Sequence, residues 1–258
     1  MTHERTLDVL FTPADFERLP DRDLSEHTCV VFDVLRATSS MIVALANGAK
    51  AIHPVADIPE ALALRRARPE VLLAGERHGV RIRGEQTGGV DFDLGNSPRE
   101  FTPEAVSGRE LVMTTTNGTR ALRACSGAGR VFVGALLNLE TLATRIAAIP
   151  SRHLLIVCSG TFEESALEDV LAAGALVDRL GADWRRGHFS DGARIARDLF
   201  RSCADDLEAA LAASLNGRRL LQKPMLHDDV AFCARRDSVS LIAVQERNQV
   251  VRALPEAP

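Results

Sequence analysis

The stretch Cys29-Val30-Val31-Phe32-Asp33, followed by Thr38-Ser39-Ser40, decides the fold of this chain. Four consecutive apolar residues that end at an acidic residue are typical of a strand buried on both faces of a sheet. The hydroxyl residues are a plausible cap for a following helix, because apolar residues recur at helical spacing from Met41 to Ala49. We therefore predict a strand–loop–helix unit whose loop carries Asp33.

The same alternation continues along the chain. Apolar runs predict strands at 51–55, 71–74, 111–113, 131–133, 154–158 and 239–244, and amphipathic segments predict helices near 58, near 119 and at 137–149, 170–177 and 188–215. Such alternation predicts a three-layer α/β/α fold with a largely parallel or mixed central sheet. No Pro/Gly-rich linker interrupts it, so we expect a single domain over residues 1–258; a regulatory extension at residues 1–25 is left open.

Composition narrows the class of protein. The 258 residues are 46% apolar with a net charge of −4, which excludes a disordered or fibrous chain and argues against a nucleic-acid partner. No signal peptide begins the sequence, and no apolar run approaches the roughly 20 residues that cross a bilayer. Five scattered cysteines without a C-x-x-C pair fit a reducing compartment. We expect a cytoplasmic protein without a membrane partner, and the sequence leaves its oligomeric state open, a homo-oligomer included.

Ligands of open α/β sheets bind beyond the carboxyl ends of the strands. The loops predicted there carry carboxylates, hydroxyls, amides and arginines: Asp33 and Arg36, then Glu76 and Arg77, Asn96 and Ser97, Thr114 to Arg120, and Ser159 to Thr161 with Glu168 and Asp169. Three of the carboxylates, those of Asp33, Glu76 and Asp169, are oxygen ligands suited to Mg²⁺. Together with arginines, such a set suits phosphoryl chemistry, in which charge neutralisation dominates.

Neighbouring residues in these loops differ in what they predict. Ser165-Ala166-Leu167-Glu168 matches a helix capping box, which explains Glu168 as structural and leaves Asp169 for function. The run Thr114 to Thr119 places hydroxyls and backbone N–H groups before a helix, where an anion would bind. It lacks the spacing and the lysine of a P-loop.

The sequence lacks the motifs of several enzyme classes. The chain has no H-E-x-x-H, no G-x-S-x-G and no G-x-G-x-x-G after a strand, which argues against a zinc hydrolase, an α/β-hydrolase and a dinucleotide-binding enzyme. His78 is the only histidine beside a candidate site residue, and an exposed loop position also explains it.

At these residues the sequence resembles the 2-phosphosulfolactate phosphatase family. The matching blocks follow the family's order and are 33–39, 74–77, 94–98, 115–119 and 167–169 with 173–175, with weaker similarity at 214–218 and 228–233. The resemblance implies an α/β/α fold and Mg²⁺-dependent hydrolysis of 2-phospho-3-sulfolactate to 3-sulfolactate and phosphate, a step of coenzyme M biosynthesis. The stretch 84–90 is longer than the family pattern, so we expect a longer loop at the pocket mouth and, more generally, a 2-hydroxy-acid phosphate as substrate.

Both lines of reasoning lead to one hypothesis for the site. Asp33, Glu76 and Asp169 hold Mg²⁺, and Asp33, Arg36 and Asp169 are the catalytic residues. The substrate is bound by Arg77, Asn96, Ser97, Thr115, Thr116, Asn117, Gly118 and Thr119. A metal-activated water is preferred as nucleophile over Asp33, because Leu35 stands where haloacid-dehalogenase phosphatases have their second aspartate. The rival functions are a small-anion sensor without turnover and a Mg²⁺-dependent isomerase or transferase.

Overall fold

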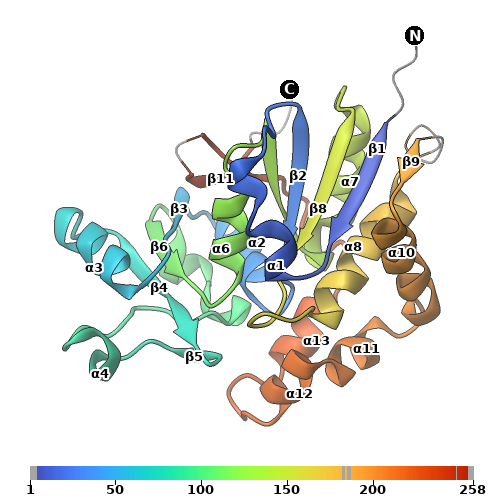
Figure 1. Ribbon diagram of the computed structural model, residues 1–258. Coiled ribbons are helices and arrows are strands. Elements are labelled where there is room, and N and C mark those ends of the chain that lie inside the picture. Colours follow the sequence, from blue (N-terminus) through green and yellow to red (C-terminus); the bar gives the residue numbers. More distant parts are fainter. Residues whose placement is uncertain (1–4, 182–183, 185–186, 248, 255–258) are drawn as a thin grey trace.

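The computed structural model describes residues 5–181, 184, 187–247 and 249–254. Its strands form one 11-stranded sheet in the order β5-β4-β6-β3-β11-β10-β7-β2-β8-β1-β9 (Figure 1). The strands are β1 (Thr6–Leu10), β2 (His27–Phe32), β3 (Ala51–Pro54), β4 (Leu72–Arg77), β5 (Val80–Arg81), β6 (Glu110–Thr114), β7 (Arg130–Gly134), β8 (His153–Cys158), β9 (His188–Phe189), β10 (Ala243–Gln245) and β11 (Val251–Ala253).

Helices connect most of these strands. The described α-helices are α1 (Pro13–Phe16), α2 (Ala37–Ala46), α3 (Ile58–Ala67), α4 (Gly84–Thr87), α5 (Pro103–Val106), α6 (Gly118–Ala124), α7 (Leu139–Ala148), α8 (Leu167–Arg179), α10 (Asp191–Cys203), α11 (Leu207–Ala213), α12 (Leu215–Leu221) and α13 (Asp229–Ala234). Short 3₁₀ helices are η1 (Leu19–Asp21), η2 (Pro98–Glu100) and η3 (Leu136–Asn138).

The sheet is mixed because a hairpin joins two parallel blocks. Strands β7, β2, β8, β1 and β9 pair in parallel, and so do β3, β6 and β4. Between the blocks, β10 pairs antiparallel with β7 and with β11, and β11 pairs antiparallel with β3. The C-terminal part of the chain therefore closes the centre of the sheet.

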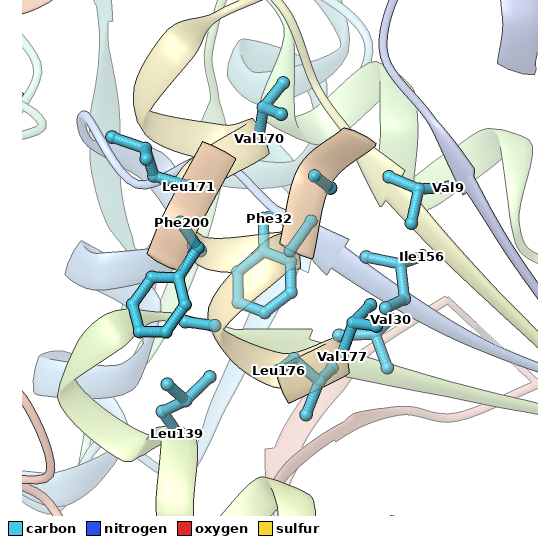
Figure 2. Packing of buried hydrophobic residues seen from close by; sticks show 14 of the residues in the cluster. Val9, Val30, Phe32, Leu139, Ile156, Val170, Leu171, Leu176, Val177 and Phe200 are labelled. Atoms are coloured by element: carbon cyan, nitrogen blue, oxygen red, sulfur yellow. The ribbon is translucent and has the colours of Figure 1, made fainter. Parts of the chain in front are cut away.

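Alternating side chains of β2 enter two different cores, which gives the fold its three layers. Val30 and Phe32 belong to the core covered by α7, α8 and α10, and Figure 2 shows them packing there with Phe200. Cys29 and Val31 face the opposite core, which α2 and α6 cover. The predicted α/β/α fold is thereby confirmed.

The sequence predicted most of the central elements correctly and missed those near the ends of the chain. Strand β1 pairs with β8 over its full length, and Phe16 and Leu24 are buried, so residues 6–24 are part of the folded body rather than an extension. Strand β11 was not predicted, and residues 1–4 and 255–258 of the expected single domain lie outside the described residues. Cys29 and Cys158 are buried, as expected of core thiols.

Among the helices that the structure describes, none combines the length and the apolarity needed to cross a bilayer.

Close packing of α8 against α10 depends on Gly174. A Cβ at this position would overlap the backbone carbonyl of Ala196 and lie 2.8 Å from Cβ of Phe200. We expect Gly174→Ala to lower the free energy of unfolding by about 2 kcal/mol or more, because the helices must separate. Urea unfolding followed by circular dichroism measures this change.

Gly127→Ala is the matched control, because a Cβ there meets nothing within 4 Å. It should leave stability unchanged or raise it slightly. An equal effect of both substitutions would contradict this account of the α8–α10 contact.

Candidate active site

A cavity of about 540 Å³ lies where segments following β2, β6 and β8 meet the turn after β4 and the helix α12. In Figure 1, α11, α12 and α13 lie beyond the lower end of the sheet, next to this region. Asp33, Arg36, Glu76, Asn96, Thr115, Thr116 and Asn117 line the cavity, as the sequence predicted. The predicted Arg77, Ser97, Gly118, Thr119 and Asp169 do not line it.

Local backbone contacts fix Asp33 at the cavity wall. The Thr38 hydroxyl donates to the Asp33 carbonyl at 2.9 Å and accepts from the Asp33 N–H, so it binds the strand end instead of capping α2. The Ala37 N–H donates to Asp33 Oδ1 at 2.9 Å. Gly118 packs so close that a Cβ on it would lie 2.5 Å from Asp33 Oδ2. Gly118 thus makes room for the Asp33 carboxylate.

Three buried carboxyl groups influence one another here. Burial raises the pKa of Asp33 to about 6, and the nearby charges of Glu76 and Glu168 raise it too. Burial also raises the pKa of Asp169 well above its ordinary range, with repulsion from Asp33 and Glu168 acting in the same direction. Burial raises the pKa of Glu168 as well. Negative charge is therefore costly at this end of the sheet unless a cation neutralises it.

Asp169 serves the backbone around the site. Its Oδ1 accepts from the Val34 N–H at 2.8 Å, and its Oδ2 accepts from the Ser159 hydroxyl and the Gly160 N–H at 3.0 and 3.2 Å. The side chain is only 2% exposed. It therefore joins the segments after β2 and β8 beneath the cavity, and its oxygens already have donors.

The capping-box interpretation of Glu168 is wrong. Helix α8 begins one residue later than expected, with Ala166 at the N-cap and no side-chain cap bond. Glu168 therefore points inward, where it is 1% exposed and its Oε1 accepts from Asn216 Nδ2 at 2.6 Å. Its Oε2 is buried without a hydrogen-bond partner. Neither of the two adjacent acids lines the cavity, and Glu168 is the one with an oxygen that lacks a hydrogen-bond partner.

The threonine-rich segment after β6 donates hydrogen bonds to the carboxylate of Glu76. The N–H and the hydroxyl of Thr116 both donate to Glu76 Oε1 at 2.9 Å, and the Gly79 N–H donates to Glu76 Oε2 at 2.7 Å. Thr119 donates to the Thr115 carbonyl, behind the cavity wall. Thr119 is therefore part of the scaffold of this segment and not of the predicted anion cradle.

The two predicted arginines have different positions. Arg36 lines the cavity, but its Nη1 is paired with Asp229 Oδ2 at 2.6 Å and its Nη2 donates to the Gly79 carbonyl. Arg77 lies outside, donating to the Glu76 carbonyl and to the Thr114 hydroxyl. Glu76 and Arg77 are consecutive residues of a strand, so their side chains point to opposite faces and only one can enter the cavity.

Asp229 is a buried acid that the sequence prediction missed. It is 0% exposed and binds Arg36, Ser97 and Arg99. Ser97 therefore faces Asp229 at 2.7 Å and not the cavity. The weakly matching block 228–233 was the one sequence signal for this residue.

The wall built by α12 and the residues after it was also missed. Asn216, Arg219 and Lys223 line the cavity, as do Phe162 and His78 on other segments. The weak block 214–218 pointed to this helix, but nothing in the sequence placed it across from Asp33. The stretch 84–90, expected at the pocket mouth, contributes no lining residue and folds in part as α4.

The expected metal ligands do not form one set. Among the described residues, no three His, Cys, Asp or Glu side chains are grouped as ligands of one ion, so Asp33, Glu76 and Asp169 do not form such a group. Buried oxygens without a donor are nevertheless present: Asn96 Oδ1, Asn117 Oδ1 and Glu168 Oε2. Oxygen donors of this kind fit a hard cation, which needs only one or two protein carboxylates.

The raised pKa of Asp33 makes the stability of the metal-free protein depend on pH. The pKa of Asp33 is about 6 in the folded protein and the ordinary 3.8 in the unfolded chain, so protonation of this carboxyl favours the folded state. The resulting stabilisation is present at low pH and is lost as the pH rises through 6. From pH 7 to pH 5 in EDTA, the free energy of unfolding should rise by about 1 kcal/mol more in the wild type than in Asp33→Asn. Urea unfolding at both pH values measures the difference.

Asp205→Asn, which alters an exposed carboxyl, should follow the wild type. A pH dependence that Asp33→Asn leaves unchanged would show that Asp33 does not titrate in this way.

Comparison with known proteins identifies the family. The 2-phosphosulpholactate phosphatase family model matches residues 14–248. A probable 2-phosphosulfolactate phosphatase of Caldicellulosiruptor saccharolyticus is 39% identical over 246 residues, covering 94% of this chain and 98% of the relative. A protein of the same name from Symbiobacterium thermophilum is 37% identical over 234 residues, covering 90% of this chain and 97% of that relative.

A third relative, from Pseudothermotoga lettingae, carries the same name and is 37% identical over 250 residues, 96% of this chain and the whole of the relative. The match extends through all segments that line the cavity, from the end of β2 to the residues after α12. The chain thus belongs to the 2-phosphosulfolactate phosphatase family, a family of phosphoric monoester hydrolases.

Proposed function

We propose that this protein hydrolyses the phosphate ester of 2-phospho-3-sulfolactate, or of a closely related 2-hydroxy acid, to the free acid and inorganic phosphate. Family membership supports the reaction class. The observation that carries the proposal is the buried carboxyl of Asp33 in a cavity that also holds donor-free oxygens and cationic side chains. That combination suits a metal-assisted reaction of an anionic ester.

Mg²⁺ is the proposed cofactor, held by Asp33 and by Glu168 Oε2, with Asn96 and Asn117 supplying neutral oxygens nearby. The donor-free oxygens of these last three side chains support this choice. When bound, Mg²⁺ supplies charge neutralisation for the phosphate oxygens. Glu76 and Asp169, whose oxygens accept from Thr116, Gly79, Val34 and Ser159, are reassigned as positioning residues.

The chain's own groups hold the reacting ester. Arg36, oriented by Asp229, presents a guanidinium fixed on one side of the cavity, and hydrogen bonds from an arginine to phosphate are strong. Thr115 and Asn117 also line the cavity. We assign attack on phosphorus to water, with Asp33 as a ligand, because phosphoryl transfer depends on positioning and charge neutralisation. An aspartyl-phosphate on Asp33 is the alternative.

A small-anion sensor is the rival function, and a Mg²⁺-dependent isomerase or transferase is another. The buried acids argue against the sensor, because additional negative charge weakens simple anion capture. We also place the reaction in the cytoplasm and in coenzyme M biosynthesis; the five free cysteines fit a reducing compartment.

Release of inorganic phosphate distinguishes the phosphatase from the sensor and from the isomerase or transferase. With 2-phosphosulfolactate, purified protein should release inorganic phosphate in the presence of Mg²⁺ and lose that activity in EDTA, because the buried acids need a counter-cation. Zn²⁺ should replace Mg²⁺ poorly, since the cavity offers oxygen ligands. A colorimetric phosphate assay measures the rate.

Binding of the substrate without phosphate release would favour the sensor, and an organic phosphate product would favour the isomerase or transferase. Full activity in exhaustive chelator would remove the metal from the mechanism.

Substitutions of the adjacent acids Glu168 and Asp169 should have different effects on Mg²⁺ binding and on stability. Glu168→Gln keeps the shape of the side chain and should keep the fold, but it should abolish the thermal stabilisation that Mg²⁺ gives the wild type. Asp169→Ala deprives two buried backbone N–H groups of their acceptor and should cost on the order of 3 kcal/mol in the free energy of unfolding. Differential scanning fluorimetry with a Mg²⁺ titration and urea unfolding separate the two effects.

If Asp169→Ala unfolds the chain, Ser159→Ala provides the milder comparison, because it removes one donor to the same carboxylate. A normal Mg²⁺ response in Glu168→Gln would exclude Glu168 as a ligand.

A further inference from the structure

Two cationic side chains on one wall of the cavity have no acidic partner in the described part of the chain. They are Arg219 and Lys223, from α12 and the residues that follow it. The other cation of the lining, Arg36, is offset by the fully buried Asp229. Among the described lining residues, Arg219 and Lys223 are therefore the arginine and lysine whose charge no acid of the protein pairs with.

Each of the two cations has a fixed place. The Arg219 guanidinium lies over the ring of Phe162, 5.3 Å from its centroid, although Phe162 itself is 46% exposed. Lys223 is half-buried, and its Nζ donates to the His78 carbonyl at 2.5 Å. A Cβ on Gly79 would lie 3.1 Å from this Nζ, so the absence of a side chain there leaves room for the ammonium group. Arg219 is thus the more exposed of the two, beside Phe162, whereas Lys223 lies against the 78–79 turn, whose Gly79 carbonyl also accepts from Arg36.

The charge of the proposed substrate indicates a role for Arg219 and Lys223. A 2-phosphosulfolactate molecule carries roughly four negative charges near pH 7, because its phosphate contributes about two and its carboxylate and sulfonate one each. A divalent cation held by Asp33 and Glu168 offsets little beyond the charge of those two acids. Arg36 lines the cavity but is already paired with Asp229. The acid groups of the substrate need further positive charge, which Arg219 and Lys223 can supply.

We propose that Arg219 and Lys223 form a second anion subsite that selects the acid tail of the substrate, with Lys223 binding the carboxylate and Arg219 the sulfonate. This assignment rests on the proposed phosphatase function. The carboxylate is attached to the carbon that bears the ester, so it must bind closer to the reacting phosphate than the sulfonate does. Lys223 suits it, because this side chain lies at the same 78–79 turn as Arg36, the proposed phosphate-binding arginine. The sulfonate is one carbon farther out and meets the more exposed Arg219, where the Phe162 ring fixes the guanidinium.

Substrates that differ only in the sulfonate test the assignment. Values of kcat/KM are compared for 2-phosphosulfolactate and 2-phospholactate. Arg219→Met should lower the value for 2-phosphosulfolactate by about 30-fold and that for 2-phospholactate by less than about threefold, because a hydrogen bond to a charged group is lost only with the first. Lys223→Met should lower both values by a similar factor.

A substitution of the neighbouring Arg218 and a conservative substitution of Arg219 complete the test. Arg218→Met, an exposed change on the same helix outside the cavity lining, should leave both values unchanged. Arg219→Lys should recover part of the preference, since it keeps the charge but loses the planar fork. Equal losses for both substrates in Arg219→Met would overturn the assignment of the sulfonate, and unchanged values in Lys223→Met would overturn that of the carboxylate.

A binding measurement keeps this inference separate from the proposed function. If wild-type protein hydrolyses neither substrate, the proposed phosphatase function fails, but calorimetric titration with 3-sulfolactate and with lactate still examines the subsite. Wild-type protein should bind 3-sulfolactate more tightly than lactate, and Arg219→Met should remove most of that difference. A difference that persists in Arg219→Met would overturn the subsite whatever the enzymatic result.

Discussion

Three carboxyl groups, those of Asp33, Glu168 and Asp169, are buried close together at the ends of β2 and β8, and the arrangement of the site depends on how their charge is balanced. Asp169 joins the segments that follow the two strands, by accepting from Val34 after β2 and from Gly160 after β8. Burial raises the pKa of all three acids, so the fold keeps them at a cost in free energy. A bound cation would offset that cost, which links the stability of this region to its proposed function.

The central part of the fold could be predicted because its strands are buried on both faces. Runs such as Cys29 to Phe32 and Leu154 to Cys158 have few alternatives to a buried strand, and each is followed by a helix that covers it. Strand β11 has only three residues and is held mainly by its pairing with β10 and β3. Tertiary pairing of this kind leaves little trace in local sequence, and for this reason the antiparallel centre of the sheet was not predicted.

Site residues were predictable at the level of segments and less so at the level of side chains. The rule that ligands bind beyond strand ends found the segments of Asp33, Asn96 and Asn117. It could not separate Glu76 from Arg77, because that depends on which face of β4 each side chain takes. The start of α8 lies one residue later than the capping box predicted, and Glu168 rather than Asp169 has the oxygen without a hydrogen-bond partner. Arg219 and Lys223 follow Asp33 by more than 180 residues, so only the folded chain brings them to the cavity.

The central claim is that the buried acids around Asp33 exist to hold a hard divalent cation. Anomalous diffraction from crystals grown with Mn²⁺, which prefers the same oxygen ligands as Mg²⁺, tests it most directly. We expect an anomalous peak in the cavity within bonding distance, about 2.2 Å, of an oxygen of Asp33, and a second protein oxygen from Glu168, Asn96 or Asn117 in the same coordination shell. A fully occupied Mn²⁺ site elsewhere, with the carboxyl of Asp33 free of metal, would contradict the claim.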